Sequence, residues 1–563
     1  MKLWTCVLVA CAAVCVACGQ QPASDEDWLE LDTPQGPVRG RKDPEADLYA
    51  FYNIPYATTP LNEDKFKPPL PAPVWTSPFD AIDKRVVCPQ PPFRLPLLPS
   101  DAVRQDDCLI ANVFVPDTAK KNLSVLVYIH GGGFFIGYGE LFKSKHFLDK
   151  KDMIVVTFNY RLGVHGFLCL GTEDAPGNAG MKDQVALLRW VNKNIASYGG
   201  NPDDVTIAGY SAGSSSVDLL MLSKSAEGLF HKVIPESGGN LAPFAIQRNP
   251  LETAKNVAKK LNFTNVDDVN ALEKFYQTAS WELLQSDKDL PIGTDSSIAF
   301  TPCIEHKTEK EAFLTETPLR ILQKGSYKKL PVLYGFANME GLMQVPFFEL
   351  YKDAMNVKFS DFLPVDLTFD SEEEKKEVGD KVKQFYFGDK PVSEDNILSF
   401  VDFFSDVMFT HSMLWAVKLH VEAGHNQIYL YEYSFVDEDI PLVPHTDVRG
   451  ADHIAQTMAV MDGRNITHTD ESTLTPDFKK MKKIAREIWH NFIKTGKPVP
   501  EGSPLPAWPA TGAAGAPYMS LDRTLELRDE PLLEKRTRFW QDIYQNYYRE
   551  PIPPPAPKSR SEL

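Results

Sequence analysis

The pentapeptide GYSAG, residues 209–213, places Ser211 between two glycines where the local sequence pattern changes. Val205 and Ile207 alternate with other residues before it, as in a strand, and an apolar helical pattern follows it. A serine on such a strand-to-helix turn projects its hydroxyl beyond the sheet, where the helix N-terminus favours developing negative charge. The pattern alone arises easily by chance, so it is this context that favours Ser211 as a nucleophile over a plain tight turn.

A nucleophilic serine needs backbone donors for the oxyanion that its attack creates, and a glycine-rich segment offers them. The apolar run 124–130 leads directly into GGGFFIG, residues 131–137. We expect the N–H groups of Gly132, Gly133 and Ala212 to point at one oxygen atom. A flexible glycine turn is the alternative, while a phosphate-binding loop is disfavoured because no Lys-Ser/Thr pair follows the glycines.

Several longer segments of the chain match the motifs of one enzyme family. These are FYNIPYATTP, DDCLIANVFVP, YIHGGGFFIG, NYRLGVHGFL, APGNAGMKDQVALLRWVNKNIASYGGNPDDVTIAGYSAG and NFIKTGKPVP. By these motifs, which span nearly all of the chain after its first segment, it resembles the type-B carboxylesterases of the cholinesterase-like α/β-hydrolase family. Within that family it looks most like insect carboxylesterases of the detoxifying and odorant-degrading kind. The resemblance implies an α/β-hydrolase fold, a small-molecule ester as substrate, an acyl-enzyme intermediate, and no metal or cofactor.

The resemblance also directs the search for the acid and the base, which follow the nucleophile in that order along α/β-hydrolase chains. The segment LPVLYGFANMEGL contains Glu340, followed by Gly341 as in the family's acid-glycine pair, and no aspartate competes with it. GADHIAQT resembles the family's G-x-x-H segment, so His453 is the expected base, with His445 in the same loop as the alternative. A surface loop position is the other interpretation of each. In the expected reaction His453 takes the Ser211 proton while Glu340 fixes its tautomer.

Three departures from the family pattern bear on the substrate and on the surroundings of the base. Tyr210 stands where the family often has glutamate and juvenile-hormone esterases usually have glutamine. The segment between Cys88 and Cys108 lacks the tryptophan with which cholinesterases bind cations, so a quaternary-ammonium substrate is disfavoured. Gln456 stands three positions after the base, where an acidic residue is usual, which leaves the hydrogen bonds behind His453 open.

The resemblance further implies a disulfide between Cys88 and Cys108, and a supporting role for Ser237, in PESGG, behind the catalytic residues. For Ser237 a plain strand-end hydroxyl is nearly as good an interpretation. Cys169 and Cys303 lie in apolar segments, which is consistent with free buried thiols, but the sequence leaves open whether they are free.

The N-terminus and three sequons indicate export. Residues 1–18 contain an apolar run after Lys2 and are predicted to be a secretory signal peptide, with a bacterial lipoprotein signal as the alternative. The N-x-S/T sequons at Asn122, Asn262 and Asn465 fit a secreted eukaryotic protein, although each could equally be an unmodified surface asparagine. We expect an extracellular protein. The lumen of the endoplasmic reticulum is the alternative, because the C-terminal RSEL loosely resembles a retention signal.

Near-continuous apolar runs predict the strands of the fold, and they are typical of strands buried on both faces. They cover residues 124–130, 153–160, 204–209, 231–237, 330–336 and 428–435. Helical patterns cover about 181–195, 478–496 and 532–547. This alternation predicts an α/β fold with a mostly parallel central sheet and helices on both faces. The stretch 250–325 is predicted to be a mostly helical insertion that could roof the site.

No repeat or flexible linker divides the chain, so we expect one α/β-hydrolase domain over residues 21–550 and an extended proline-rich tail over 551–563. The 563 residues are 43% hydrophobic with a formal charge of -17, which suits a globular protein and disfavours a nucleic-acid partner. Beyond the signal, no segment is long and apolar enough to span a membrane. The histidines form no H-E-x-x-H or similar metal-ligand set, and nothing in the sequence indicates the oligomeric state.

Two rival functions remain beside ester hydrolysis. Some members of the family are non-catalytic adhesion or binding proteins, which typically have lost the nucleophile. The other rival is sequestration, in which Ser211 is acylated quickly and deacylated slowly. The complete set of Ser211, Glu340 and His453 beside an intact glycine loop favours a secreted esterase for small to medium, mostly neutral carboxylic esters.

Overall fold

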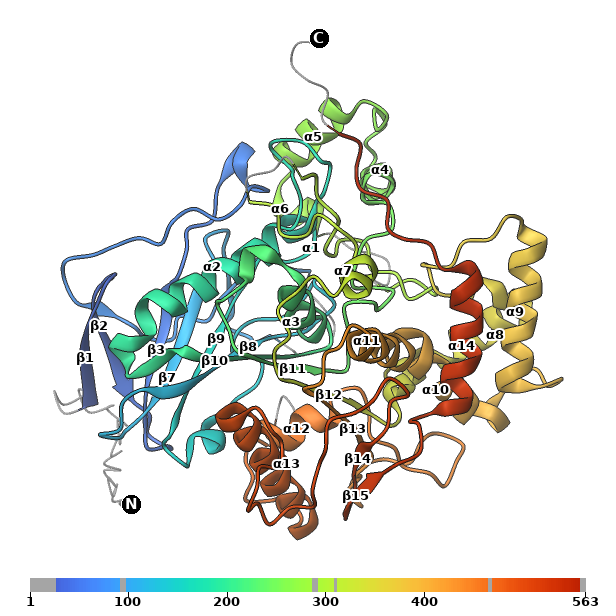
Figure 1. Cartoon of the computed structure of the whole chain (residues 1–563). Helices are drawn as coiled ribbons and strands as arrows, with labels where there is room; N and C mark the ends of the chain where they lie inside the picture. Colours follow the sequence, from blue (N-terminus) through green and yellow to red (C-terminus); the bar gives the residue numbers. More distant parts are fainter. Residues whose placement is uncertain (1–26, 92–97, 286–291, 308–310, 464–467, 557–563) are drawn as a thin grey trace, which may run out of the picture.

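The computed structural model of this chain describes residues 27–91, 98–285, 292–307, 311–463 and 468–556. These residues are organised by a 13-stranded sheet (Figure 1). In spatial order its main strands are β1 (Trp28–Thr33), β2 (Gly36–Lys42), β3 (Leu48–Pro55), β7 (Ile110–Pro116), β9 (Met153–Phe158), β8 (Leu123–Ile129), β10 (Gly200–Tyr210), β11 (Lys232–Glu236), β12 (Val332–Ala337), β13 (Ile428–Tyr433), β14 (Tyr518–Leu521) and β15 (Leu525–Arg528). A short strand, β4 (Phe79–Asp80), pairs with β2, while β5 (Val86–Val87) and β6 (Val103–Arg104) form a separate ladder.

The middle of the sheet, from β9 through β8 and β10 to β14, is parallel throughout. Antiparallel pairs lie at the two ends, among β1, β2, β3, β7 and β9 and between β14 and β15. The predicted mostly parallel sheet is therefore confirmed. Each of the predicted apolar runs coincides with a strand from β8 to β13, although β10 begins at Gly200, before the predicted residue 204.

Helices cover both faces of the sheet (Figure 1). Figure 1 shows α2, α3 and α11 on one face and α12 and α13 on the other, with α8, α9, α10 and α14 grouped beside the C-terminal half. The helices are α1 (Gly163–Phe167), α2 (Ala179–Asn194), α3 (Ala212–Leu222), α4 (Pro250–Lys260), α5 (Val269–Thr278), α6 (Trp281–Leu284), α7 (Pro318–Lys324), α8 (Phe348–Val357), α9 (Glu372–Phe387), α10 (Ile397–Ser405), α11 (His411–Glu422), α12 (Ala455–Val460), α13 (Pro476–Thr495) and α14 (Glu534–Tyr547).

The predicted helical insertion at 250–325 is helical only at its two ends. α4, α5 and α6 fill its first part and α7 its last, whereas the described residues between α6 and α7 form no helix. Turn-forming residues explain the difference, because short polar side chains bond to the nearby backbone and compete with a helix. Asp295, for example, accepts the backbone N–H of Ser297 at 3.1 Å.

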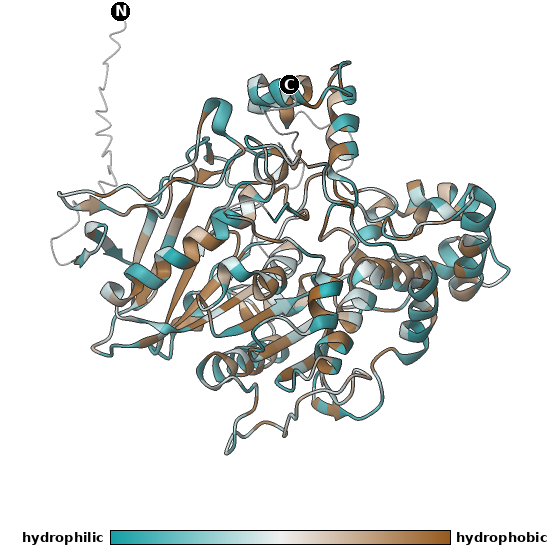
Figure 2. Ribbon diagram, turned by 45° about the horizontal axis from the view of Figure 1, so that its top comes forward, coloured by the Kyte–Doolittle hydropathy of each residue, from teal (hydrophilic) through white to brown (hydrophobic). Residues whose placement is uncertain are grey.

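Alternate residues of the central strands enter two hydrophobic cores, one on each face of the sheet. In β8, Val125, Val127 and Ile129 belong to the core that includes residues of α2, α3 and α11. Leu126 and Tyr128 belong to the core that includes residues of α13. Figure 2 shows the result, with hydrophobic strands inside and hydrophilic outer faces on the helices. Burial on both faces is why these strands are continuous apolar runs in the sequence.

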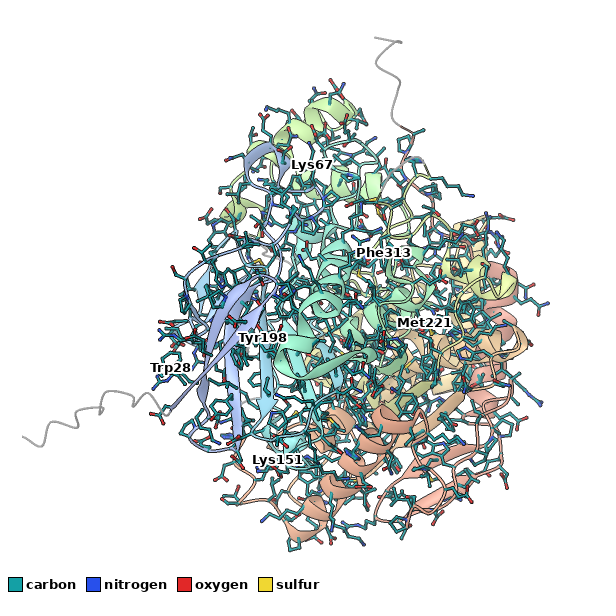
Figure 3. The ribbon with its side chains drawn as sticks, turned by 60° about the vertical axis from the view of Figure 1, so that its left-hand side comes forward. Trp28, Lys67, Lys151, Tyr198, Met221 and Phe313 are labelled. Atoms are coloured by element: carbon teal, nitrogen blue, oxygen red, sulfur yellow. A yellow bond between two sulfur atoms is a disulfide. The ribbon has the colours of Figure 1, made fainter. Side chains whose placement is uncertain are left out.

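The antiparallel strands at the start of the chain are joined to the parallel sheet by side-chain packing. Phe51 of β3 packs edge-on against Tyr198, which follows α2, with ring centroids 5.1 Å apart; Tyr198 is labelled in Figure 3. The Trp190 indole of α2 donates to Gln35 at 2.8 Å, and the Gln35 amide donates to the carbonyl of Pro55 at 2.6 Å. The N-terminal strands and the central sheet are therefore one packed unit.

Contrary to the prediction from the sequence, one helical stretch, Glu394–Glu422, is long and apolar enough to cross a membrane by length and composition. It contains α10, the π-helical turn Asp406–Thr410 and α11. In its most apolar window, 83% of the residues are buried inside the protein. Packing within the protein therefore explains its apolar character, and no other helix in the described ranges meets the same criteria.

Two disulfides cross-link the described residues. One joins Cys88 to Cys108, with an S–S distance of 2.00 Å. The sequence left open whether Cys169 and Cys303 are free thiols; they are not, because the structure joins them across 134 positions of sequence. Gly177 makes room for this bridge, since a Cβ there would lie 2.6 Å from the Cys303 sulfur. Buried thiols and buried disulfides share apolar surroundings, so local sequence does not distinguish them.

Several predicted features lie outside the described residues. They are the signal peptide at 1–18, the sequon at Asn465 and the end of the C-terminal tail. The tail residues that are described, 551–556, have no regular secondary structure. Asn122 and Asn262 are both exposed and both adopt a positive φ.

The second disulfide predicts that Cys169 and Cys303 contribute measurably to stability. Replacing both by serine should lower the free energy of unfolding by about 2–5 kcal/mol, because the unfolded chain then regains the freedom that a long closed loop removes. Denaturation of the wild type and the double variant measures the difference. Thiol-specific alkylation of the denatured, unreduced wild type, followed by mass spectrometry, should label neither cysteine; labelling of both would contradict the bridge.

Candidate active site

The carboxyl edge of the parallel strands holds every candidate catalytic residue. β8 leads to Gly132, β10 to Ser211, β11 to Ser237, β12 to Glu340, and β13 to the loop that carries His453. Neighbouring parallel strands end at the same edge of a sheet, so residues far apart in the sequence meet there. The site is thus a product of the strand order β8-β10-β11-β12-β13.

Ser211 sits on a sharp turn at the N-cap of α3, and its hydroxyl does not cap the helix. Its backbone angles are φ 55° and ψ -125°, a conformation that costs a non-glycine residue on the order of 1–3 kcal/mol. The flanking glycines permit the turn. A Cβ at Gly209 would lie 2.5 Å from the carbonyl oxygen of Gly213, and one at Gly213 would lie 2.2 Å from that of Ile129. The Ser211 N–H donates to the carbonyl of Glu236 at 2.8 Å, which ties the turn to β11.

Glu340 and His453 form a buried hydrogen-bonded pair, with Glu340 Oε2 2.5 Å from His453 Nδ1. The other carboxylate oxygen, Oε1, accepts the N–H of Ala337 at 2.8 Å and the hydroxyl of Ser237. Because Nδ1 faces the carboxylate, Nε2 is the imidazole nitrogen left for proton transfer. His445, the alternative base, is an exposed residue of the same loop. The pairing with Glu340 therefore favours His453.

Short backbone contacts hold together the two loops that carry this pair. The Met339 N–H donates to the carbonyl of Ala451 at 3.1 Å, and the Ala451 N–H donates to the Asn338 side chain at 3.1 Å. A Cβ at Gly450 would lie 2.1 Å from the Met339 sulfur, so a larger residue there would displace the Met339 side chain. These contacts fix the loop after β13 beside the loop after β12.

An aromatic ring covers one face of the His453 imidazole. Phe409 stacks on it with ring centroids 4.2 Å apart, and Phe244 packs edge-on against Phe409 at 5.7 Å. Phe409 belongs to the π-helical turn between α10 and α11, whose Asp406 is paired with Arg536 of α14 at 2.6 Å. Neither this turn nor the helices α10 and α11 on its two sides were predicted from the sequence.

Three backbone N–H groups at this edge have no acceptor among the described residues. They belong to Gly132, Gly133 and Ala212, the first residue of α3. Gly132 and Gly133 have φ values of 102° and 60°, and a Cβ at Gly132 would lie 2.1 Å from the carbonyl oxygen of Ile136. Glycine is therefore required at Gly132, and the three N–H groups are donors that the described part of the fold does not itself use.

Two buried polar side chains that the sequence analysis did not single out support the glycine loop. Gln90, inside the first disulfide loop, accepts the Gly137 N–H at 3.0 Å and donates to the Gly137 carbonyl at 3.0 Å. His130, directly before the glycines, stacks on Tyr160 with ring centroids 4.4 Å apart and bonds through Nδ1 to the Gly131 carbonyl at 2.8 Å. Burial lowers the pKa of His130 to about 4, so its ring is neutral at neutral pH.

Tyr210 places its ring beside the imidazole of the base. The ring centroids of Tyr210 and His453 are 6.4 Å apart, and Phe142 packs edge-on against Tyr210 at 4.9 Å. The Tyr210 ring also occupies the space that a side chain at Gly131 would need. Burial raises the pKa of its phenol well above the ordinary value, so Tyr210 stays uncharged. Tyr210 therefore fills space beside Gly131 and presents an uncharged side chain next to His453.

Glu236, at the end of β11, is a fully buried carboxyl group that the sequence analysis did not single out. It accepts hydrogen bonds from the hydroxyl of Tyr431 and, at 2.7 Å, from that of Thr457. Burial raises the pKa of Glu236 to about 7, and the charge of Glu340 acts in the same direction. A group that titrates near neutral pH thus lies one residue before Ser237.

Gln456 supplies the hydrogen bonds behind the base that its sequence position left open. Its amide donates to Ser237 Oγ, and Ser237 donates in turn to Glu340. Ser237 therefore touches the candidate acid directly, as the resemblance implied, and an amide stands where the family usually has a carboxylate.

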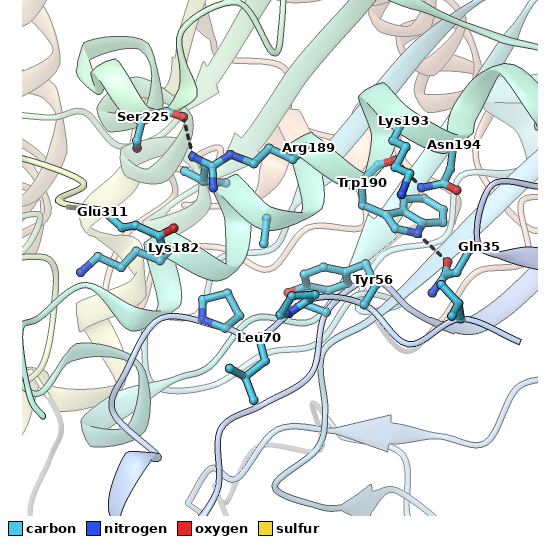
Figure 4. Close-up of a pocket in the computed structure, with 17 residues that line it drawn as sticks. Gln35, Tyr56, Leu70, Lys182, Arg189, Trp190, Lys193, Asn194, Ser225 and Glu311 are labelled. Carbon is cyan, nitrogen blue, oxygen red and sulfur yellow. Dashed lines mark hydrogen bonds between the residues drawn. The ribbon is translucent and has the colours of Figure 1, made fainter.

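A surface cavity of about 390 Å³ lies between α2 and the segment 69–74 (Figure 4). Its wall combines apolar residues such as Leu70 and Trp190 with Arg189 and Lys193 of the helix. None of the candidate catalytic residues lines it. This cavity therefore belongs to the outer surface of α2 and is separate from the candidate active site.

One cluster in the described part of the chain has side chains of the types that bind metal ions, namely His146, Asp462 and Glu471. Arg486 pairs with Glu471 at 2.5 Å and lies 3.5 Å from Asp462. The guanidinium group already balances the carboxylates, so the cluster is explained as an ion-pair network.

Comparisons with known proteins agree with this geometry. The family model described as the carboxylesterase family matches residues 27–540. Esterase FE4 of Myzus persicae is 31% identical over 478 residues, 81% of this chain and 82% of the relative. Para-nitrobenzyl esterase of Bacillus subtilis (strain 168) is 29% identical over 91% of this chain and 98% of its own. The crystal structure of juvenile hormone esterase from Manduca sexta, with OTFP covalently attached, matches with a TM-score of 0.81 at 27% identity, covering 92% of this chain and 100% of that one.

The raised pKa of Glu236 predicts a pH-dependent term in stability. The folded protein holds this proton more tightly than the unfolded chain, where the ordinary value is 4.5. The stabilisation is therefore complete below pH 4.5 and is lost as the pH rises through about 7. At about 1.4 kcal/mol per pKa unit, the wild type should lose about 3 kcal/mol relative to Glu236→Gln over this range.

Thermal denaturation of the wild type and Glu236→Gln, side by side from about pH 4 to about pH 8, measures this term. The melting temperature of Glu236→Gln should rise steadily relative to that of the wild type as the pH rises. A difference that is constant with pH would contradict the assignment.

Proposed function

The chain belongs to the carboxylesterase family, and we propose that it is a serine esterase for small to medium, mostly neutral carboxylic esters. The observation that carries the proposal is the 2.5 Å contact of Glu340 with His453 at the strand edge where Ser211 occupies its strained turn. A carboxylate, an imidazole and a serine supplied in this way are the groups that acyl transfer requires.

The proposed reaction proceeds through an acyl-enzyme. Ser211 Oγ attacks the ester carbonyl while His453 Nε2 takes its proton, and Glu340 stabilises the resulting imidazolium. The open N–H groups of the glycine loop and of Ala212 stabilise the oxyanion. The tetrahedral intermediate collapses, and the alcohol leaves with the proton from His453. Water, deprotonated by His453, then attacks the acyl group and releases the acid and Ser211.

The proton transfer requires a contact that substrate binding completes. In the described part of the chain, no hydrogen bond joins the Ser211 hydroxyl to His453. Catalytic hydrogen bonds of this kind are often long in the free enzyme and tighten in the substrate complex. The short contact on the Nδ1 side of the imidazole holds the ring ready for that step.

Neutral and apolar groups around the base support an uncharged substrate. Phe409 and Phe244 form an aromatic surface on one side of His453, and the uncharged Tyr210 lies on another. The segment from Cys88 to Cys108 has no tryptophan in its sequence to attract a cation. Degradation of apolar esters such as odorants or xenobiotics is the role that these features fit best.

Secretion is part of the proposal. It is supported by the signal-like residues 1–18 and by two disulfides, which form and persist in oxidising compartments. The sequons at Asn122 and Asn262 are exposed, so both are accessible to glycosylation. Retention in the endoplasmic reticulum is the alternative localisation.

A non-catalytic or slow-turnover binding protein is the alternative function. One observation favours this alternative: the described structure has no hydrogen bond between Ser211 and His453, and an inactive site would also lack it. A fluorophosphonate probe should react with Ser211 in the proposed esterase and in a slow-turnover enzyme, but not in a pure binding protein. A burst of product without steady turnover would identify the slow one.

Replacing the nucleophile tests the proposal directly. Ser211→Ala should reduce kcat for chromogenic acyl esters by at least about a thousandfold and abolish labelling by a fluorophosphonate probe. Ser215→Ala is a matched control on the same helix, because the buried Ser215 hydroxyl has no hydrogen-bond partner among the described residues. Equal hydrolysis by wild type and Ser211→Ala would reject the proposed function.

Tyr210 provides a test of substrate charge. Tyr210→Glu should raise activity toward a choline ester relative to its neutral 3,3-dimethylbutyl analogue by about five- to tenfold, because a carboxylate beside the base attracts the cationic alcohol. Tyr210→Gln has the same size without the charge and is the control. An unchanged ratio of kcat/KM for the two esters would mean that Tyr210 faces away from the substrate and serves packing alone.

A further inference from the structure

A chain of hydrogen bonds runs from Gln456 to the base and passes through a single hydroxyl. Gln456 Nε2 donates to Ser237 Oγ, Ser237 donates to Glu340 Oε1, and Glu340 Oε2 lies 2.5 Å from His453 Nδ1. Gln456 is 1% exposed, and Ser237 and Glu340 are fully buried. Bulk water therefore does not replace any of these links.

The chemistry of the three groups fixes the direction of the chain. An amide nitrogen can only donate a hydrogen bond, and the Ser237 hydroxyl has one hydrogen. Once the hydroxyl oxygen accepts from Gln456, that hydrogen is directed to Glu340. An ionised carboxylate in place of Gln456 can only accept, so it would compete with Glu340 for the same hydrogen.

The other end of the Gln456 amide shows that packing alone does not account for this residue. Gln456 Oε1 is buried and has no hydrogen-bond partner among the described residues. An unpartnered buried acceptor is unfavourable, so an apolar side chain of the same size would pack at lower cost. Attachment of α12 does not require Gln456 either, because Thr457 already bonds the same turn to Glu236. The hydrogen bond that Gln456 donates to Ser237 is therefore the interaction that explains a glutamine at this position.

We propose that Gln456 is a positioning residue that, through Ser237, lowers the pH at which His453 acts as a base. The inference rests on the proposed function, because it concerns the proton transfer from Ser211. With the Ser237 hydrogen directed to it, Glu340 has less unsatisfied negative charge with which to stabilise an imidazolium. A carboxylate at position 456 would take that hydrogen and add a charge of its own, and both changes favour the imidazolium.

The other titratable groups around His453 lie on several elements. Asp452 precedes it in the loop, Glu340 bonds it from the segment after β12, and Glu236 lies behind Glu340 at the end of β11. Tyr210 approaches from β10, and an apolar ring covers the remaining face. Burial raises the pKa of Asp452 and of Glu236. All of these groups are retained when position 456 alone is changed.

The test is a double-mutant cycle in the pH dependence of kcat/KM. Gln456→Met removes the donor without adding a charge, and Gln456→Glu also introduces an acceptor. We expect the acidic limb of the profile to move to higher pH, by about 0.5 pH unit for Gln456→Met and about one for Gln456→Glu, with little change in KM. In the Ser237→Ala background, Gln456→Met should give no further shift, because its effect passes through the hydroxyl.

Thr457→Val is the matched control, since it loosens the same turn of α12 and leaves the Ser237 hydroxyl in place. It should not move the acidic limb upward, because a less stabilised Glu236 carboxylate adds no negative charge. If Thr457→Val moved the acidic limb upward as far as Gln456→Met, the effect would come from loosening this turn of α12 and not from the Ser237 hydroxyl. Unchanged profiles for both Gln456 variants, or equal shifts in the two Ser237 backgrounds, would also overturn the proposal.

Labelling of Ser211 by the fluorophosphonate probe separates this inference from the proposed function. The labelling rate depends on His453 as a base, so its pH profile gives the same reading without turnover. If the wild type neither labels nor hydrolyses esters, the proposed function fails. If it labels with a profile that does not respond to Gln456, only the role of Gln456 fails.

Discussion

The contact between the Ser211 turn and the end of β8 is the constraint on which the site depends. A Cβ at Gly213 would lie 2.2 Å from the Ile129 carbonyl oxygen, so two backbones meet there with no side chain between them. The glycine loop leaves the sheet one residue after His130, directly beyond this contact. The strained serine and the N–H groups left unpaired in the described part of the chain are thus placed by backbone contact between the start of α3 and the end of β8. Such placement does not depend on side-chain rotamers, which is what a preorganised site requires.

The second organising feature is the way in which buried carboxyl groups are stabilised without cations. Glu340 is held by a backbone N–H and a hydroxyl, and Glu236 by the hydroxyls of Tyr431 and Thr457. Hydrogen bonds from neutral donors satisfy a buried carboxylate without cancelling its charge. An arginine in their place would leave Glu340 with little field at the imidazole. Neutral donors therefore stabilise Glu340 while its charge remains available to His453.

The sequence predicted those parts of the fold and the site that have a local signature. The continuous apolar runs marked the strands because both faces of the central sheet are buried, and the glycines around Ser211 marked a turn that only close backbone contact explains. Features that arise from contacts between distant segments had no such signature. The bridge from Cys169 to Cys303 and the clamp of Gln90 on the glycine loop are of this kind.

The two departures from the family pattern that lie nearest His453 have the same electrostatic effect. Tyr210 approaches the imidazole from β10 and Gln456 reaches it through Ser237, and both are neutral where a carboxylate is usual. Each missing charge weakens the attraction of the site for any cation, whether it is a quaternary ammonium group or the imidazolium of the enzyme's own base. The proposed preference for neutral esters and the proposed activity at lower pH are therefore two consequences of the same electrostatic change. On this proposal, a change of charge around Ser211, Glu340 and His453 alters the substrate and the pH of action without moving any of the three residues.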